Sequence, residues 1–230
     1  MENLNFKNLC IVGDIHGEFP TLVRKTEDFG IEDTALIVAG DFGLGFDKKL
    51  KRLYPKLHKR LEKRNNCIYG VRGNHDNPES FNPESELFVN LPRLKALPDF
   101  TRLSWGTREI LVIGGATSRD KDERTEGEDW WPDENITKDT SPLEMHEDII
   151  ISHEAPLCIG PVATRHEGMS LEIYHKILED RRFLDQVLKE TRPRRWYFGH
   201  YHRPTSGNWG ETLWKGLEIN EIIEVRDEIC

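Results

Sequence analysis

Residues 9–17 read LCIVGDIHG, an apolar run that stops at a glycine and is followed by two polar side chains, Asp14 and His16. An apolar run of this length is typical of a buried strand. The arrangement returns after four more apolar runs, at residues 35–39, 67–71, 149–151 and 196–198. The side chains that follow those runs are Asp41, Asn74 with His75, His153, and His200 with His202. Polar side chains gathered at strand ends are typical of an active site in an open α/β sheet.

Several segments between these apolar runs have the residue pattern of helices. Helical spacing of apolar residues predicts helices over residues 18–29, 47–64 and 171 to about 190, with Ser170 as the N-cap of the last. Pro55 falls inside the second and is expected to kink or restart it. Further strands, at a sheet edge or in a second sheet, are expected at residues 87–89, 100–103, 109–113, 209–214 and 217–225.

Length and composition bound the class of protein. A chain of 230 residues can bury one substantial core, so we expect a single domain over residues 1–230. With 37% hydrophobic and 32% charged residues, no apolar run long enough to span a membrane and no secretion signal over Met1–Lys7, a cytoplasmic location is expected. The scattered cysteines, without a CxxC pair, are expected to be reduced.

The net charge of -9 is concentrated in one segment. Twelve acidic residues stand against four basic ones between Ser118 and Asp148, which leaves the rest of the chain nearly neutral. We therefore expect an acidic insertion at about residues 116–148. The overall charge then says little about whether the substrate is a polyanion.

The polar groups at the strand ends suit a site for two metal ions. Asp14 and His16, two residues apart, can grip one ion with a carboxylate and an imidazole. The carboxylate of Asp41 can bridge two ions about 3.5–4 Å apart. Asn74 offers a neutral amide oxygen after Gly73, and the adjacent His75 must then point elsewhere, which leaves a free imidazole beside the metals.

Any one of these histidines alone is more often a satisfied core residue than a ligand. Five of the nine histidines, however, stand beside strand ends in short, spaced groups. That concentration favours the two-metal interpretation over a set of unrelated core histidines.

In this order the motifs resemble those of the calcineurin-like metallophosphoesterases. The family pattern of DxH, GD, GNH followed by an acid, a lone His and GHxH corresponds here to residues 14–16, 40–41, 73–76, 153 and 199–202. The resemblance covers residues 13–202. It implies an α/β fold with a two-sheet β-sandwich flanked by helices, and metals at the carboxyl ends of the strands.

The resemblance also implies a role for each residue. Asp14, His16 and His202 would hold one ion, and Asn74, His153 and His200 the other, with Asp41 between them. His75 would be the general acid or a stabiliser of the transition state, oriented by Asp76. Mn is the expected ion on the resemblance alone; Fe, Zn, Ni and Co also suit a ligand set of nitrogen and oxygen atoms without thiolate.

These roles predict hydrolysis of a phosphodiester or phosphomonoester by a hydroxide that bridges the two metals. The expected substrates are nucleotides or nucleic-acid ends, and no membrane or protein partner is implied. One alternative is a serine/threonine phosphoprotein phosphatase, but the Asp-Arg pair of that branch is missing, because Phe42-Gly43-Leu44-Gly45 follow Asp41. A catalytically silent scaffold is the other, and it conflicts with the retention of every ligand and of His75.

The insertion offers two candidates for contact with substrate, Arg119 and Arg124, near the tryptophan pair 130–131. An arginine could clamp a phosphate and a tryptophan could stack on a base. The other interpretation is a self-paired acidic lid that a tryptophan anchors to the core. The basic segment 48–64 could bind nucleic acid, although such runs are more often a solvated helix face.

Overall fold

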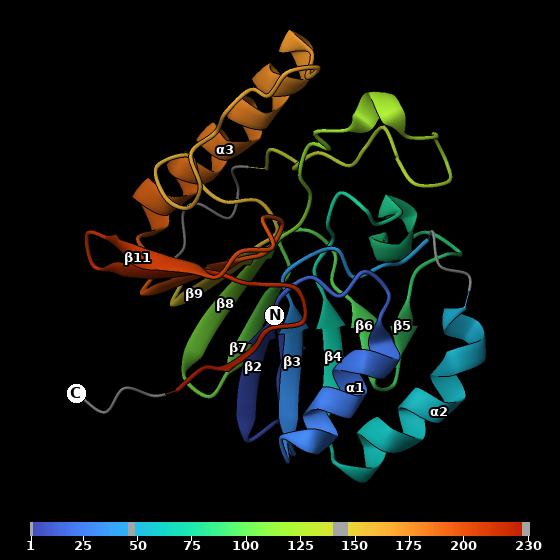
Figure 1. The fold of residues 1–230 in the computed structure, drawn as a ribbon. Coiled ribbons are helices and arrows are strands. Elements are labelled where there is room, and N and C mark those ends of the chain that lie inside the picture. Colours follow the sequence, from blue (N-terminus) through green and yellow to red (C-terminus); the bar gives the residue numbers. More distant parts are fainter. Residues whose placement is uncertain (1, 46–48, 140–146, 227–230) are drawn as a thin grey trace.

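The computed structural model describes residues 2–45, 49–139 and 147–226. In these residues the chain forms two mixed β-sheets that pack face to face, with helices on their outer sides (Figure 1). This architecture confirms the expected two-sheet sandwich flanked by helices.

Four parallel strands form the centre of the first sheet: β2 (Asn8–Val12), β3 (Thr34–Val38), β4 (Cys67–Gly70) and β6 (Leu94–Ala96). Antiparallel strands close its two edges, β13 (Ile222–Glu224) beside β2 and β5 (Asn90–Leu91) beside β6. Because β2, β3 and β4 are neighbours and parallel, their carboxyl ends lie side by side.

The second sheet repeats this plan with a parallel centre of β8 (Arg108–Ile113), β9 (Ile149–Ser152), β10 (Arg195–Phe198) and β12 (Thr212–Gly216). The flanking strands are β7 (Arg102–Trp105), with β1 (Glu2–Asn3) beyond it, and β11 (Thr205–Trp209) at the other edge. The expected strands at residues 100–103 and 109–113 therefore belong to this second sheet.

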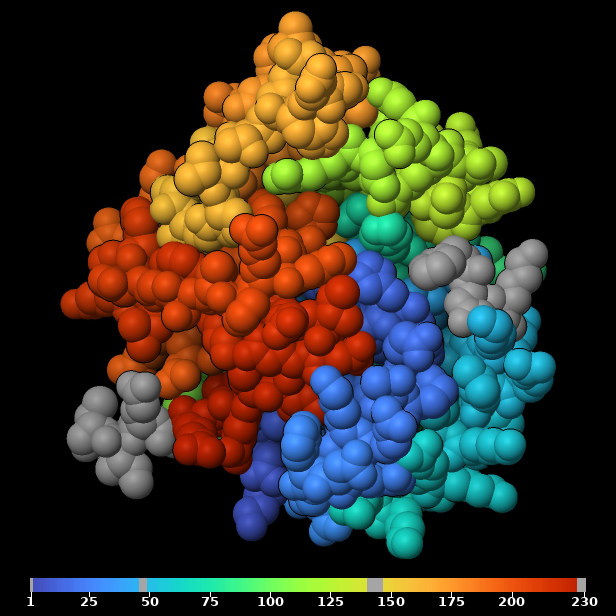
Figure 2. Space-filling view, in the orientation of Figure 1, coloured from blue at the N-terminus to red at the C-terminus, as the bar shows by residue number. Residues whose placement is uncertain are grey.

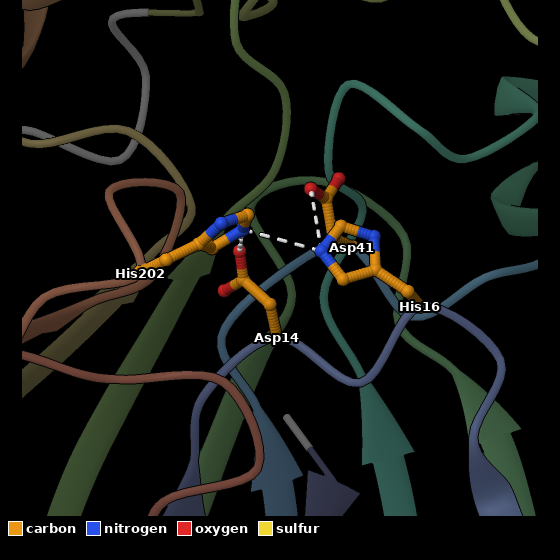
Figure 3. Close-up of side chains that lie close together, drawn as sticks. All are labelled: Asp14, His16, Asp41 and His202. Atoms are coloured by element: carbon orange, nitrogen blue, oxygen red, sulfur yellow. Dashed lines mark hydrogen bonds and ion pairs between the residues drawn. The ribbon is translucent and has the colours of Figure 1, made fainter.

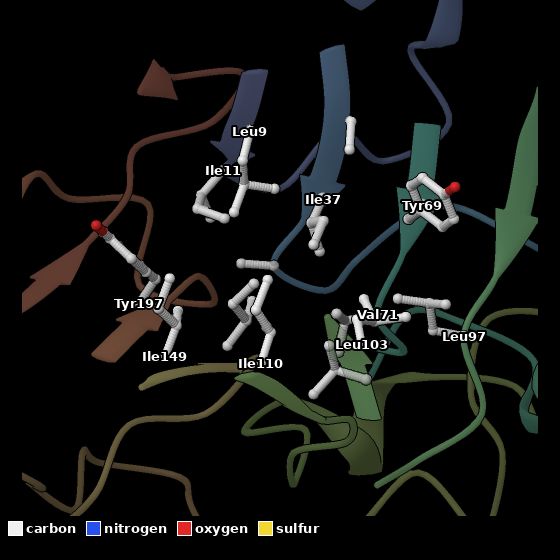
Figure 4. Packing of buried hydrophobic residues seen from close by; sticks show 14 of the residues in the cluster. Leu9, Ile11, Ile37, Tyr69, Val71, Leu97, Leu103, Ile110, Ile149 and Tyr197 are labelled. Carbon is white, nitrogen blue, oxygen red and sulfur yellow. The ribbon is translucent and has the colours of Figure 1, made fainter. Parts of the chain in front are cut away.

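The main core lies between the two sheets (Figure 4). The inner face of the first sheet contributes Leu9, Ile11 and Ile37, which meet Ile110 and Ile149 of the second sheet. All five side chains are at most 1% exposed. Side chains alternate along each strand between this core and the helix-covered face. A slip by one residue would exchange the two sets of side chains and misfit both layers, which fixes the register of the sheets.

Helices cover the outer faces through two further apolar clusters. Helices α1 (Phe19–Asp28) and α2 (Leu50–Lys63) pack on the first sheet, and α3 (Leu171–Thr191) packs on the second. The Ser170 side chain accepts a hydrogen bond from the N–H of Ile173, as expected of an N-cap. Each sheet is thus buried on both sides, which accounts for apolar runs in place of strict alternation.

Helix α2 differs in one respect from the sequence expectation. It runs unbroken from Leu50 to Lys63, so Pro55 does not restart it. Arg60 pairs with Glu27 at 2.6 Å and Arg64 with Glu32 at 2.7 Å, which ties basic residues of this segment to neighbouring acids. These pairs favour the solvated helix face over nucleic-acid binding.

Three expected strands are wrong in detail. Residues 87–89 precede the short strand β5 and are not a strand themselves. Residues 209–214 contain the turn between β11 and β12, where Gly210 has a φ of +56°, so a hairpin replaces the single strand. Of residues 217–225 only β13 is extended. Cys10, Cys67 and Cys158 are free, as expected, and Cys230 lies outside the described residues.

The acidic insertion follows β8. Apart from a single turn of 3-10 helix at Lys121–Glu123, it forms neither helix nor strand as far as the description extends, to residue 139 and again from 147. Figure 2 shows the insertion beside α3 at one end of the molecule. A second short 3-10 helix, Pro78–Phe81, follows the loop after β4.

We predict that Ile37→Ala lowers the free energy of unfolding by about 2–5 kcal/mol, because the change leaves a cavity between the two sheets. Ile37 is fully buried, whereas Phe29 is 70% exposed. The control Phe29→Ala should stay within about 0.5 kcal/mol of the parent. Urea unfolding at equilibrium measures both values, and similar costs for the two variants would contradict the assigned core.

Candidate metal centre

All the polar groups singled out in the sequence lie at the carboxyl ends of strands from both sheets. Three loops of the first sheet, after β2, β3 and β4, meet two loops of the second, after β9 and β10. The structure brings together the side chains of Asp14, His16, Asp41, Asn74, His75, His153, His200 and His202.

Four of these side chains form a first cluster: Asp14, His16, Asp41 and His202 (Figure 3). One potential ligand atom from each lies within 4.8 Å of the others. The Nε2 atom of His202 is 3.0 Å from Asp14 Oδ2, and that of His16 is 3.8 Å from Asp41 Oδ2. Two carboxylates and two imidazoles at such distances could hold one divalent ion.

A second cluster shares Asp41 with the first. The Nε2 atom of His153 lies 3.3 Å from Asp41 Oδ1, 3.0 Å from Asn74 Oδ1 and 3.2 Å from His200 Nδ1. Asp41 therefore directs Oδ1 to this cluster and Oδ2 to the first. A shared carboxylate is the arrangement that holds two ions close together.

A hydrogen bond at one ring and a nearby carboxylate at the other orient the two histidines of the second cluster. The Nδ1–H of His153 donates to the carbonyl oxygen of Ala39 at 3.0 Å, which leaves Nε2 free to bind an ion. His200 turns Nδ1 inward, and its Nε2 lies 3.8 Å from the buried carboxylate of Glu154. Such partners behind a ligand fix the orientation of the ring.

Four of the seven candidate ligands have an unusual backbone conformation. The φ angles are +45° at His16 and Asp41, +67° at His200 and +52° at His202. This left-handed region costs free energy for any residue with a side chain, although Asn, Asp and His enter it most readily. Strained residues that persist in a well-packed loop tend to mark functional sites.

The glycine before a ligand has a steric reason. A Cβ atom added to Gly73 would lie 2.1 Å from Asp41 Oδ1, and one added to Gly199 would lie 2.0 Å from Asp14 Oδ1. Both distances are far shorter than any van der Waals contact. The motifs that contain Gly73 and Gly199 therefore require glycine, because the loops of Asp41 and Asp14 pass too close to these positions for a side chain.

Electrostatics favour a charged Asp41. Burial opposes the charge, but the imidazoles of His153, His75 and His16 outweigh it and hold the pKa of this carboxyl well below its usual range. At His202 the hydrogen bond to Asp14 raises the pKa against the effect of burial. The centre thus contains anionic oxygens among imidazole nitrogens, which suits a divalent cation.

His75 stands apart from both clusters. Its ring lies edge-on to that of His16 at a centroid distance of 5.1 Å, and its backbone N–H donates to Asp41 Oδ1 at 2.9 Å. The Arg124 guanidinium reaches it from the insertion, with Nη2 2.9 Å from His75 Nε2. Burial lowers the pKa of His75, and the Arg124 charge lowers it further against the opposite effect of Asp41. The imidazole beside the clusters is therefore biased towards its neutral form.

Asp76 has a different environment from the one expected of a residue that orients His75. Its carboxylate accepts hydrogen bonds from the backbone N–H groups of Phe42, Gly43, Leu44 and Gly73. None of the hydrogen bonds described for Asp76 reaches the His75 ring. Burial and the nearby Asp41 charge raise the pKa of Asp76 to about 7, against these N–H donors. This carboxylate holds together the two loops that carry Asp41 and Asn74.

A cavity of about 240 Å³ opens above the clusters. Both arginines singled out in the insertion line it, beside Asp41, Asn74, His75, Asp120, His200, Tyr201 and His202. Arg124 forms an ion pair with Asp120 at 2.7 Å, and the Arg119 guanidinium lies 5.9 Å from the centre of the Tyr201 ring. Trp130 and Trp131 do not line this cavity; the Lys121 ammonium lies 5.0 Å from the centre of the Trp130 ring.

Three buried polar residues behind the ligands escaped the sequence analysis: Ser118, Glu134 and Glu154. Ser118 contacts Asn74 and Glu134, and Glu154 accepts a hydrogen bond from the hydroxyl of Tyr201. Glu154 directly follows the candidate ligand His153, and this adjacency is the one sequence feature that could have indicated its place in the site. Glu134 is one of twelve acids in its segment, and no pattern separates it from the others. Burial raises the pKa of Glu134, while the Ser118 hydrogen bonds and the Arg124 charge oppose the rise.

Comparison with a solved structure supports the fold. Over 98% of both chains, the structure is similar to phosphopantetheinyl hydrolase from Mycobacterium tuberculosis, with a TM-score of 0.52 and 13% identity. A protein of Streptococcus pneumoniae TIGR4 described as a predicted phosphoesterase matches over 96% of this chain and 83% of its own, with a TM-score of 0.41 and 12% identity. No curated protein matches the chain significantly. No described helix is long and apolar enough to cross a membrane.

The family itself is established by sequence. The model of the family described as calcineurin-like phosphoesterase matches residues 7–204, which span every loop of the candidate metal centre. The two clusters and the two-sheet fold agree with that match. The chain belongs to the calcineurin-like phosphoesterases and is a metal-dependent hydrolase of phosphoric esters.

Proposed function

We propose that the chain hydrolyses phosphoric esters with two divalent ions at this centre. Asp14, His16 and His202 hold one ion; Asn74, His153 and His200 hold the other. The observation that carries the proposal is the orientation of Asp41, which directs one carboxylate oxygen to each cluster. When bound, the ions supply an activated water at neutral pH and positive charge for the phosphoryl oxygens.

The donor set supports a transition metal. Imidazole nitrogens, carboxylate oxygens and one amide oxygen suit Mn, Fe, Zn, Co or Ni, whereas a thiolate is missing from the described cluster. We propose Mn on the resemblance to the family. The hydrogen bond behind His153 fixes the orientation of that donor.

His75 is proposed to act on the substrate. It lines the cavity, and it lies outside both clusters of ligands. Burial and the Arg124 charge favour its neutral form, whereas an incoming phosphate would add negative charge beside the ring and favour protonation. A protonated His75 can give its proton to the leaving oxygen or stabilise charge in the transition state.

Arg119 and Arg124 are proposed to bind the phosphate group. Arg124 is 9% exposed at its side chain and is already held by Asp120, so little freedom is lost when it binds an anion. Two guanidiniums beside two ions suit the dianion of a terminal phosphate. The cavity of about 240 Å³ is small and supports recognition of the phosphate end of a nucleotide or nucleic acid, with the remainder of the substrate outside.

The first test compares aryl phosphodiester and aryl phosphomonoester hydrolysis after loading with Mn, Ni, Co, Zn or Fe in turn. We expect turnover with at least one ion, a preference for the monoester, and loss of both activities in Asp41→Ala, because that change removes the carboxylate common to both clusters. Ion binding of the variant should be measured in parallel. If no metal gave turnover of either ester, the proposed function would be wrong.

The second test concerns His75. We expect His75→Ala to keep two bound ions and to lose about 10²–10⁴-fold in kcat on an alkyl phosphate, whose poor leaving group needs a proton. A general acid predicts a much smaller loss on an aryl phosphate with a good leaving group. Stabilisation of charge on the phosphoryl group predicts equal losses on both esters. Full activity of the variant on the alkyl ester would contradict either role.

The third test concerns Arg124. Because a hydrogen bond to a charged group contributes about 1.5–3 kcal/mol, Arg124→Ala should lower kcat/KM for the monoester by roughly 10–100-fold. The matched control is Arg52→Ala, which removes the same charge from an exposed position of α2. Inhibition by inorganic phosphate should weaken in parallel only in the Arg124 variant. Equal effects of the two substitutions would argue against a phosphate contact.

A further inference from the structure

A short chain of buried hydrogen bonds runs from the candidate ligand Asn74 into the acidic insertion. The Nδ2 atom of Asn74 donates to Ser118 Oγ at 2.9 Å. The Ser118 hydroxyl donates in turn to a carboxylate oxygen of Glu134, and the Ser118 N–H donates to the other at 2.9 Å. Asn74, Ser118 and Glu134 are all at most 2% exposed, so water does not compete for these bonds.

The chain has a direction, because both hydrogen bonds between Ser118 and Glu134 run from Ser118, from its N–H and from its hydroxyl, to the two carboxylate oxygens. The Ser118 proton is therefore committed to Glu134, and Ser118 Oγ is left as an acceptor towards Asn74. Only the NH₂ end of the Asn74 amide can satisfy that acceptor. Its Oδ1 consequently faces the second cluster, 3.0 Å from His153 Nε2. Reversal of the amide would present N–H groups to the cluster, and N–H groups cannot bind a cation.

We infer that Glu134, acting through Ser118, is a positioning residue that sets which end of the Asn74 amide faces the second ion. The insertion thereby controls the affinity of one ion of the two. This inference rests on the two-ion centre proposed above. It adds that the acidic segment serves the metals as well as the substrate.

A second set of contacts holds the segment around Glu134, where this series of hydrogen bonds ends. Arg72 stands two residues before Asn74 and is 3% exposed. Its guanidinium donates to the carbonyl oxygens of Asp133, Glu134 and Asn135 at 3.0, 2.9 and 2.9 Å, and it pairs with Asp99 at 2.7 Å. The loop that carries the ligand thus also fixes the segment that carries its positioning carboxylate.

The test counts bound Mn²⁺ by equilibrium dialysis, without reference to turnover. Wild type should bind two ions. In Glu134→Gln the introduced amide can donate to Ser118, so the hydroxyl is free to reverse and Asn74 with it. We expect the affinity for one ion to fall about 10–100-fold, with the other unchanged. Ser118→Ala should weaken the same ion, and Glu128→Gln, at an exposed position of the insertion, should change neither.

A double variant tests the direction itself. Asn74→Asp alone puts two carboxylates on one hydroxyl and should also weaken the second ion. In Asn74→Asp/Glu134→Gln the introduced amide donates to Ser118, and Ser118 donates to the introduced carboxylate, so every partner is satisfied in the reversed direction. The double variant should bind the second ion at least tenfold more tightly than Asn74→Asp alone, although it has one negative charge fewer near the ion. Positioning by polarity predicts this rescue; the change in charge alone predicts the opposite order.

Several outcomes would overturn the inference. The first is that Glu134→Gln and Ser118→Ala bind both ions with wild-type affinity. The second is that a variant shown by circular dichroism to be folded binds both ions more weakly by the same factor. A double variant that binds the second ion no more tightly than Asn74→Asp alone is a third. Failure of wild type to bind two Mn²⁺ ions would instead overturn the two-ion centre, and that result appears before any variant is measured.

Discussion

One buried carboxylate, that of Asp41, has to face two clusters of ligands at once, and much of the fold meets that requirement. Its strand, β3, lies between β2 and β4, so the loops after all three strands reach it. His153 comes from the opposite sheet, which must therefore pack with its carboxyl ends at the same edge. The core between the sheets fixes this alignment, because the register that buries Ile37 and Ile149 also sets where each strand ends.

Much of this could be predicted from the sequence, for a physical reason. A strand buried on both faces is a plain apolar run, and the polar residue that ends it is conspicuous, as at Gly13-Asp14 and Gly40-Asp41. Edge strands carry a weaker signal. The hairpin of β11 and β12 turns within two residues, and the Trp209 and Trp214 positions on its two strands resembled a single run. Register across a turn is decided by partners distant in the chain, and a local pattern does not contain them.

Site residues that lie far along the chain from the ligand they contact escaped prediction. A ligand beside a strand end has a local signature, whereas Ser118 and Glu134 act on Asn74 from 44 residues away or more along the chain. Their role depends on burial, and burial cannot be predicted in a segment whose many acidic residues are typical of an exposed surface. Asp76 shows the converse, because its place beside His75 suggested a catalytic partner, yet its hydrogen bonds join two backbone loops. Adjacency in sequence specifies a position but not the direction in which a side chain points.

The left-handed backbone at His16, Asp41, His200 and His202 also limits how the centre can evolve. Among residues with side chains, Asn, Asp and His adopt this conformation at the lowest cost, while β-branched residues are strongly disfavoured. Substitutions at these four positions are therefore largely restricted to Asn, Asp and His, whose side chains are hard or borderline metal ligands. A lineage of this fold can exchange one oxygen or nitrogen ligand for another with the loops intact, but a soft, sulfur-rich centre would require new loops.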